Sequence, residues 1–239
     1  MKIKKFVCNA LQENAYVVSS GDSCVIIDPG FATAETGAFP GEPFFGEHGN
    51  DAGAAGELSG LYKYLDSEGL TPEAILLTHS HSDHTLGVAP LVEKFGIPVY
   101  SASGSFQTPT DAFSCLRPAG EGVQTPEKAI SCLQVEDEGS VAGFKVIATP
   151  GHTPDSVCYY SEAEHVLFTG DTLFAGTIGR TDLPGGDYDR EIVSIMEKLI
   201  FLPGETDIYP GHGPASTIAR ERRENPFLEP FNEREEMDL

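Results

Sequence analysis

Short apolar runs alternate along this chain with stretches in which apolar residues recur every three or four positions. The apolar runs predict buried strands at 24–27, 74–77, 145–148, 156–160 and 165–168. The spacing of three and four predicts amphipathic helices within 58–65, 88–95 and 192–200. Strands that alternate with helices predict an α/β fold in which helices cover the sheets.

Two segments have no such period. Residues 31–56 are rich in Gly, Ala, Pro and Glu and predict a long acidic loop, which is either a functional lid or a dispensable insertion. Residues 225–239 are charged and predict a peripheral tail. Since no repeat or linker divides the chain, we predict a single domain over 1–239.

The charge excludes several classes of partner. The chain has 37 acidic and 15 basic residues, a formal net charge of −22. Binding to nucleic acid or to an anionic membrane surface requires clustered Lys and Arg, so we expect neither. The partner that remains is a small molecule, while the oligomeric state is not indicated.

The cysteines and the N-terminus indicate a cytoplasmic protein. The five cysteines are an odd number without a C-x-x-C pair, and Cys24 and Cys158 lie in apolar runs, so we expect buried free thiols. The N-terminal lysines precede no apolar segment of signal-peptide type. No window approaches the roughly 18 apolar residues of a membrane span.

One short segment is rich in metal-binding side chains. His79, His81, Asp83 and His84 lie within six residues, directly after a predicted strand. In extended backbone His79 and His81 point to the same side. Asp83 and His84 lie where the chain turns toward the next helix, so they can face a second position nearby.

Three further candidates follow later strands. His152, Asp171 and His212 each lie just past an apolar run, in a turn that contains Gly or Pro. Imidazole and carboxylate ligands without thiolates suit Zn, Fe, Mn, Ni or Co better than Ca or Mg. Seven ligands are too many for one ion, so we predict two ions with Asp171 as the bridging carboxylate. Two metals about 3.5–4 Å apart can hold a hydroxide at neutral pH, which predicts a hydrolytic site.

The order and spacing of these residues resemble the metallo-β-lactamase superfamily. The motif His79-x-His81-x-Asp83-His84, the three later ligands and the early Asp28 all match. The resemblance implies a four-layer αβ/βα sandwich with the metals at one edge of two mixed sheets. It implies that Asp28 orients the ligands. It also implies the division of ligands: His79, His81 and His152 for metal one, Asp83, His84 and His212 for metal two, and Asp171 shared.

Within the superfamily, the stretches 170–174 and 179–182 resemble two groups. One is the short, glyoxalase II-like bacterial hydrolases (the hydroxyacylglutathione hydrolase type), which cleave acylglutathione thioesters. The other is the persulfide dioxygenases, which use a single iron. Residues 209–214, followed by 225–227, are more similar to the first group. Only 239 − 212 = 27 residues follow the last ligand, too few for the helical substrate domain of full-length glyoxalase II, so the thiol carrier is not indicated.

We therefore predict a metal-dependent thioesterase. Its substrate would be S-lactoylglutathione or a related acyl-thiol, attacked by a hydroxide that two divalent ions hold. Zinc is the expected metal, with iron or manganese as alternatives, and Asp83 and Asp171 are the catalytic carboxylates. Arg180 is predicted to bind a substrate carboxylate, although it could instead pair with Asp182 at the surface.

The main alternative is a mononuclear iron persulfide dioxygenase, whose ligands would be His79, His152 and Asp171. The other classes fit less well. A secreted β-lactamase would need a signal peptide, a nuclease would need a basic surface, and a flavodiiron protein has Glu where His81 stands. A binding module would not need both sets of ligands.

Overall fold

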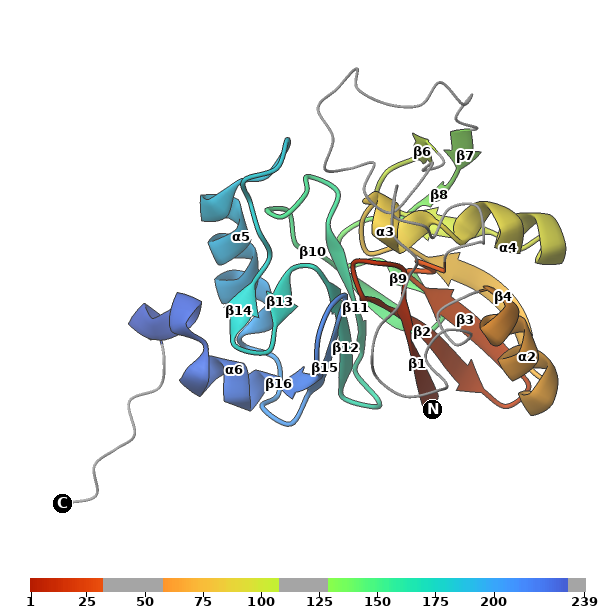
Figure 1. Cartoon of the computed structure of the whole chain (residues 1–239). Helices are drawn as coiled ribbons and strands as arrows, with labels where there is room; N and C mark the ends of the chain where they lie inside the picture. The colour runs from red at the N-terminus through yellow and green to blue at the C-terminus, as the bar shows by residue number, and fades with distance from the viewer. Residues whose placement is uncertain (32–57, 108–128, 232–239) are drawn as a thin grey trace. The chain divides into compact units, whose positions relative to one another are not determined.

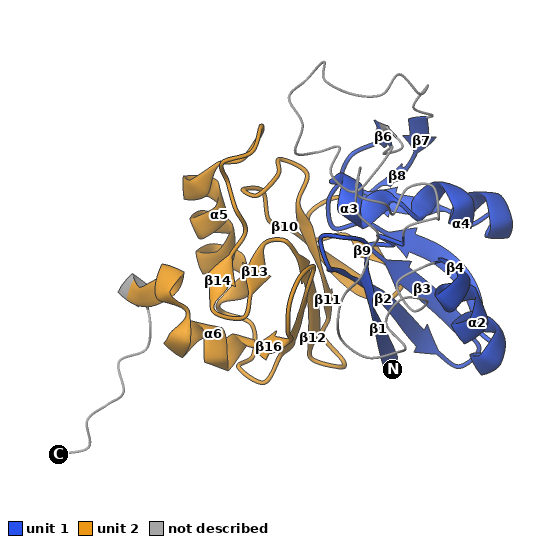
Figure 2. Cartoon of the chain, viewed as in Figure 1, with its two compact units in different colours: residues 1–135 blue, residues 136–239 orange. Residues whose placement is uncertain are grey.

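The computed structural model describes residues 1–31, 58–107 and 129–231. They fall into two compact units, Met1–Val135 and Glu136–Leu239 (Figure 2). Each unit contains one six-stranded sheet. The single domain predicted for 1–239 stays a prediction, and all but the first residue of the predicted 31–56 loop lies outside the described residues.

Unit 1 is built on a mixed sheet in the order β1-β2-β3-β4-β5-β8 (Figure 1). β1 to β3 are antiparallel neighbours, and β3, β4, β5 and β8 run parallel. The strands are β1 Lys2–Cys8, β2 Glu13–Ser20, β3 Ser23–Ile27, β4 Thr71–Leu76, β5 Val99–Ser101 and β8 Leu133–Gln134. Outside this sheet lie the helices α2 Leu58–Glu68, α3 Ser82–Thr85 and α4 Val88–Phe95, and the paired strands β6 Ser105–Gln107 and β7 Ala129–Ser131.

The helices α2 and α4 pack on one face of this sheet. The spacing of three and four residues predicted both helices, and their buried side chains belong to one core cluster with alternate residues of the strands. The cluster includes Leu61, Leu65 and Leu91 from the helices and Val17, Ile26 and Ile75 from the strands. Helix α4 ends at Gly96, whose φ of 64° allows the chain to turn away.

Unit 2 has its own mixed sheet, in the order β16-β15-β12-β11-β10-β9. Only β12 and β15 are parallel. The strands are β9 Ser140–Val141, β10 Phe144–Ala148, β11 Val157–Ser161, β12 Val166–Gly170, β15 Asp207–Pro210 and β16 Ser216–Thr217, and β13 Leu173–Phe174 pairs with β14 Thr177–Ile178 in a separate hairpin. The helices are α5 Tyr188–Ser194, which continues as the π-helical η2 Ile195–Leu199, then α6 Ile218–Glu224 and the 3-10 helix η3 Pro226–Phe231.

The predicted helical stripe at 192–200 covers the end of α5 and the π-helical turn. Its residues Ile195 and Leu199 are buried in one cluster with Leu167, Ile208 and Ile218. The predicted strands of both sheets are present, and their ends lie within three residues of the predicted ones. The two sheets are mixed, as the resemblance implied.

The segment predicted as a peripheral tail begins inside the packed part of unit 2. Asn225 and Leu228 are buried, and the Asn225 side-chain amide donates to the Thr177 carbonyl at 3.1 Å. Residues 232–239 lie outside the described residues. None of the helices in the described ranges is long and apolar enough to cross a membrane.

The four cysteines in the described ranges are all free thiols. Cys8, Cys24 and Cys158 are buried and Cys132 is half-buried, which confirms the prediction for Cys24 and Cys158, while Cys115 lies outside the described residues. Burial raises the pKa of Cys24, with a smaller contribution from Glu73, from 9.0 to about 11. Burial alone raises the pKa of Cys132 to about 11.

These raised pKa values predict slow alkylation. A shift from 9.0 to about 11 lowers the thiolate fraction at pH 8 by a factor of about 100. We expect Cys24 and Cys132 to react with iodoacetamide about 100-fold more slowly in the native protein than in urea, as followed by peptide mass spectrometry over time. Equal rates in the two conditions would contradict the prediction.

Candidate metal centre

Unit 1 contributes the four candidate ligands that follow strand β4. His79 Nε2 and His81 Nδ1 are 3.1 Å apart, so the two imidazoles converge, as their spacing of two residues predicted. Helix α3 begins directly after His81 and turns the next two candidates toward each other. His84 Nε2 lies 3.7 Å from Asp83 Oδ2, and the rings of His79 and His84 are 4.2 Å apart. His81 is half-buried and the other three are buried.

The Asp28 carboxylate contacts two residues of this segment, Thr78 and His84. Its Oδ1 accepts the Thr78 backbone N–H at 2.7 Å, and its Oδ2 accepts the Thr78 hydroxyl at 2.6 Å. Its Oδ2 also lies 3.1 Å from His84 Nδ1. A carboxylate only accepts, so His84 carries its proton on Nδ1 and leaves Nε2 available as a ligand. The resemblance implied this orienting role for Asp28.

Two residues that the sequence analysis did not identify support the same group. The Asn9 side-chain amide donates to the carbonyls of Gly30 at 3.0 Å and of Asp83 at 2.9 Å. Glu13 is fully buried, and its Oε1 lies 3.9 Å from His84 Nδ1. Ligand atoms of Glu13, Asp28 and His84 all lie within 4.8 Å of one another. The sequence offered little signal for them: Asn9 directly follows β1, and Glu13 is the first residue of β2.

Unit 2 contributes the other three candidates. Asp171 Oδ2 lies 3.6 Å from His152 Nε2 and 3.5 Å from His212 Nε2. Its carboxylate thus lies between two imidazoles, as predicted for a shared ligand. β12 and β15 are parallel neighbours, so Asp171 and His212 leave the sheet at the same edge, where the Gly211 N–H donates to the Gly170 carbonyl at 2.8 Å.

His152 is held at both its ring and its backbone. Its Nδ1 lies 2.7 Å from the Arg180 carbonyl, which can only accept, so this nitrogen carries the proton and Nε2 faces Asp171. Its backbone N–H donates to Glu191 Oε2 at 2.8 Å. The sequence analysis did not identify Glu191, because a glutamate on an amphipathic helix normally lies on the solvated face.

Glu191 is a buried carboxyl beside Asp171. Burial, together with the charge of Asp171, raises the pKa of Glu191 to about 8. The N–H groups of His152 and Gly179 act in the opposite direction, because they favour the carboxylate.

Arg180 has an exposed side chain that pairs with Asp182. Its Nε and Nη2 donate to the two carboxylate oxygens of Asp182, each at 2.8 Å. This contact lowers the pKa of Asp182 to about 2. The arrangement favours the surface pairing considered for Arg180, and its role in substrate binding stays a prediction.

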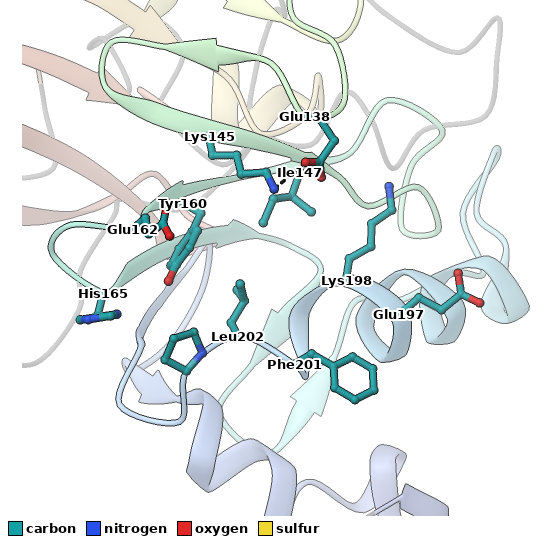
Figure 3. A pocket seen from close by; sticks show the side chains of 11 residues that line it. Glu138, Lys145, Ile147, Tyr160, Glu162, His165, Glu197, Lys198, Phe201 and Leu202 are labelled. Atoms are coloured by element: carbon teal, nitrogen blue, oxygen red, sulfur yellow. Dashed lines mark ion pairs between the residues drawn. The ribbon is translucent and has the colours of Figure 1, made fainter.

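A separate cavity of about 400 Å³ lies within unit 2 (Figure 3). Its walls include Ile147, Tyr160, Leu202 and the ion pair of Lys145 with Glu138. No candidate ligand is among its lining residues. The cavity is therefore distinct from the candidate metal centre.

The donor atoms in both units suit divalent metal ions. Two ligands bonded at about 2.0–2.2 Å to one tetrahedral ion lie roughly 3.3–3.6 Å apart. The separations of 3.1, 3.5 and 3.6 Å measured within the two groups are close to that value. The two groups contain all seven predicted ligands, four in unit 1 and three in unit 2.

Two mixed sheets with helices packed on them, and imidazoles and carboxylates at the strand ends, define an α/β protein with the donor set of a metal centre. Comparison with known proteins gives the family. The profile described as the metallo-beta-lactamase superfamily matches residues 8–212, so the chain belongs to that superfamily. Its fold is the αβ/βα sandwich of this superfamily, which confirms the predicted fold class.

Three known proteins illustrate the similarity. The "Probable metallo-hydrolase YqgX" of Bacillus subtilis is 35% identical over 237 residues, 97% of this chain and 100% of the relative. The "Hydroxyacylglutathione hydrolase GloC" of Haemophilus influenzae is 34% identical over 72% of this chain and 84% of its own length. The crystal structure of TTHA1623 "in a di-iron-bound form" has a TM-score of 0.73 and 35% identity, over 94% of this chain and 100% of that one.

Proposed function

We propose that this metallohydrolase cleaves a small-molecule thioester, either S-lactoylglutathione or a related acyl-thiol, in the cytoplasm. The observation that carries the proposal is Asp171 between the imidazoles of His152 and His212, which suits a carboxylate shared by two metal ions. The similarity to GloC, which covers 72% of this chain, supports the thioester class.

The proposed ligand sets follow the family pattern. His79, His81 and His152 would hold one ion, and Asp83, His84 and His212 the other, with Asp171 common to both. Bound there, two divalent ions would lower the pKa of a water molecule to about 7 and polarise the thioester carbonyl. We propose zinc as the native metal, while the di-iron form of TTHA1623 makes iron the first alternative.

The chain itself prepares the imidazoles for this role. Asp28 and the Arg180 carbonyl keep His84 and His152 protonated on Nδ1, so that each Nε2 can serve as a ligand. The thiol product has a pKa of roughly 8.5, so the leaving group departs as a thiolate and needs no strong general acid. Thioester cleavage therefore needs no acid–base pair in addition to the ligands.

Metal analysis combined with three activity assays tests the proposal. We expect purified protein to contain two divalent ions per chain and to hydrolyse S-lactoylglutathione, and chelation to abolish hydrolysis until zinc is restored. The competing assays are oxygen uptake with glutathione persulfide and hydrolysis of the β-lactam nitrocefin. One iron per chain with oxygen uptake and no thioester hydrolysis would overturn the proposal, as would cleavage of nitrocefin alone.

A further inference from the structure

We infer that Glu191 is a positioning residue, whose buried carboxyl group holds the turn that presents His152. The inference rests on the proposed function only in taking His152 as a metal ligand. It also gives Gly179 and Arg180 a structural role: their backbone helps to position His152.

Helix α5 and its N-cap residue Asp187 hold the turn at residues 150–152 by three hydrogen bonds. Glu191 Oε2 accepts the His152 N–H at 2.8 Å. The Asp187 N–H donates to the Gly151 carbonyl at 2.8 Å, and the Ser194 hydroxyl donates to the Pro150 carbonyl at 2.7 Å. Every residue of the turn is therefore hydrogen-bonded to this helix or to its N-cap residue.

Two glycines provide the space for this carboxyl group. A Cβ atom at Gly151 would lie 2.2 Å from Glu191 Oε2 and 2.3 Å from Glu191 Cα. A Cβ atom at Gly179 would lie 2.9 Å from Glu191 Oε1 and 2.0 Å from the Asp171 carbonyl. Since real Cβ atoms do not approach so closely, only glycine fits at either position.

The segment that contains Gly179 and Arg180 contacts both the imidazole ring of His152 and the turn that follows Asp171. The Gly179 N–H donates to the Thr172 carbonyl at 3.0 Å, and the next carbonyl, of Arg180, lies 2.7 Å from His152 Nδ1. Glu191 is thus packed against two backbone segments, one that carries His152 and one that contacts its ring. Both segments flank the ligand pair His152 and Asp171.

The free-energy cost of burying the Glu191 carboxyl group favours a role beyond packing. A buried carboxyl group costs free energy unless it is hydrogen-bonded, and a leucine would fill a similar volume without that cost. The hydrogen bond to the ligand's own backbone N–H explains why a carboxyl group is present here. Loss of such outer partners typically weakens metal affinity about 10–100-fold.

Glu221 provides a matched control for Glu191. It is also buried, on α6 of the same unit, and it also accepts hydrogen bonds, from the Gly176 N–H at 2.8 Å, the Asn225 amide at 2.9 Å and the Ser216 hydroxyl. None of these donors is a candidate ligand. Substitution of Glu221 should therefore lower stability without a specific effect on metal affinity.

The experiment compares E191L, E191D, E191Q and E221L with the wild type. Zinc affinity is measured by competition with a chromophoric chelator, the His152 backbone amide shift by NMR, and thermal unfolding on metal-free protein. We expect zinc affinity to fall about 10–100-fold in E191L, and to fall in E191D, whose carboxyl group is withdrawn by one methylene. E191Q keeps an acceptor oxygen and should restore both the affinity and the amide shift.

The outcomes separate this inference from the proposed function. Wild-type zinc affinity in folded E191L and E191D would overturn the inference, and so would an equal loss of zinc affinity in E221L. Weakened zinc binding in the Glu191 variants, from a wild-type protein that does not hydrolyse S-lactoylglutathione, would leave the inference standing and reject the proposed function.

Discussion

Replacement of Asp171 by alanine should release both metal ions and lower hydrolysis by at least about 1,000-fold. The reason is geometric. Asp171 Oδ2 lies 3.6 Å from His152 Nε2 and 3.5 Å from His212 Nε2, so the same carboxylate is close to a proposed ligand of each ion. H212A removes only one imidazole and should chiefly weaken the binding of one ion. Metal content after gel filtration in a limiting amount of chelator checks both variants.

The control for this series is D207N. Asp207 is an exposed residue at the start of β15, the same strand that ends before His212. D207N should keep the metal content and the activity of the wild type, which excludes a general effect of removing an acidic charge from this strand. Loss of both ions to the same degree in H212A and D171A would contradict the bridging role.

Substitution of Asp28 should affect metal binding and stability by two separable mechanisms. In D28A, the Thr78 N–H loses its buried acceptor at 2.7 Å, and an unsatisfied donor costs about 1–3 kcal/mol. The Thr78 hydroxyl loses its acceptor at 2.6 Å but lies 3.0 Å from His79 Nδ1. In D28N, one oxygen is kept for the Thr78 N–H, but the new amide donor faces His84 Nδ1. This favours the tautomer with the proton on Nε2, which cannot bind metal through that atom.

We therefore expect D28A to unfold at a lower temperature in the metal-free state. D28N should stay closer to the wild type in stability while losing about 10–100-fold in metal affinity. Long-range nitrogen NMR of His84 reports the tautomer directly, and D66N, on the exposed side of α2, is the matched control. A D28N protein that keeps the Nδ1-protonated tautomer and wild-type metal affinity would contradict the assigned role.

Local signals were sufficient for much of the fold. Strands β3, β4, β10, β11 and β12 follow apolar runs, and α2 and α4 follow apolar stripes, because each buries a face that its own sequence specifies. Strand β1 was not predicted. It is an edge strand with three exposed lysines, so its sequence does not have the apolar character of a buried strand.

The candidate ligands were also visible in the sequence, because each follows a strand and lies in a short turn. Their supporting residues were not visible. Glu191 reaches His152 across 39 positions of sequence, and Asn9 reaches the Asp83 carbonyl across 74. No periodic pattern marks such contacts.

The sequence by itself determined the α/β class, the buried thiols and the identity of the seven candidate ligands, since these depend on residue type and short spacing. Only the tertiary structure decided which atoms lie together. It places Asp171 close to both His152 and His212. It also brings Asp28 to His84 Nδ1 and Glu191 to the His152 N–H. The physical reason is that a buried carboxylate has the same local sequence signature as a solvated one. What distinguishes the two is the set of donors that the fold brings to them from elsewhere in the chain.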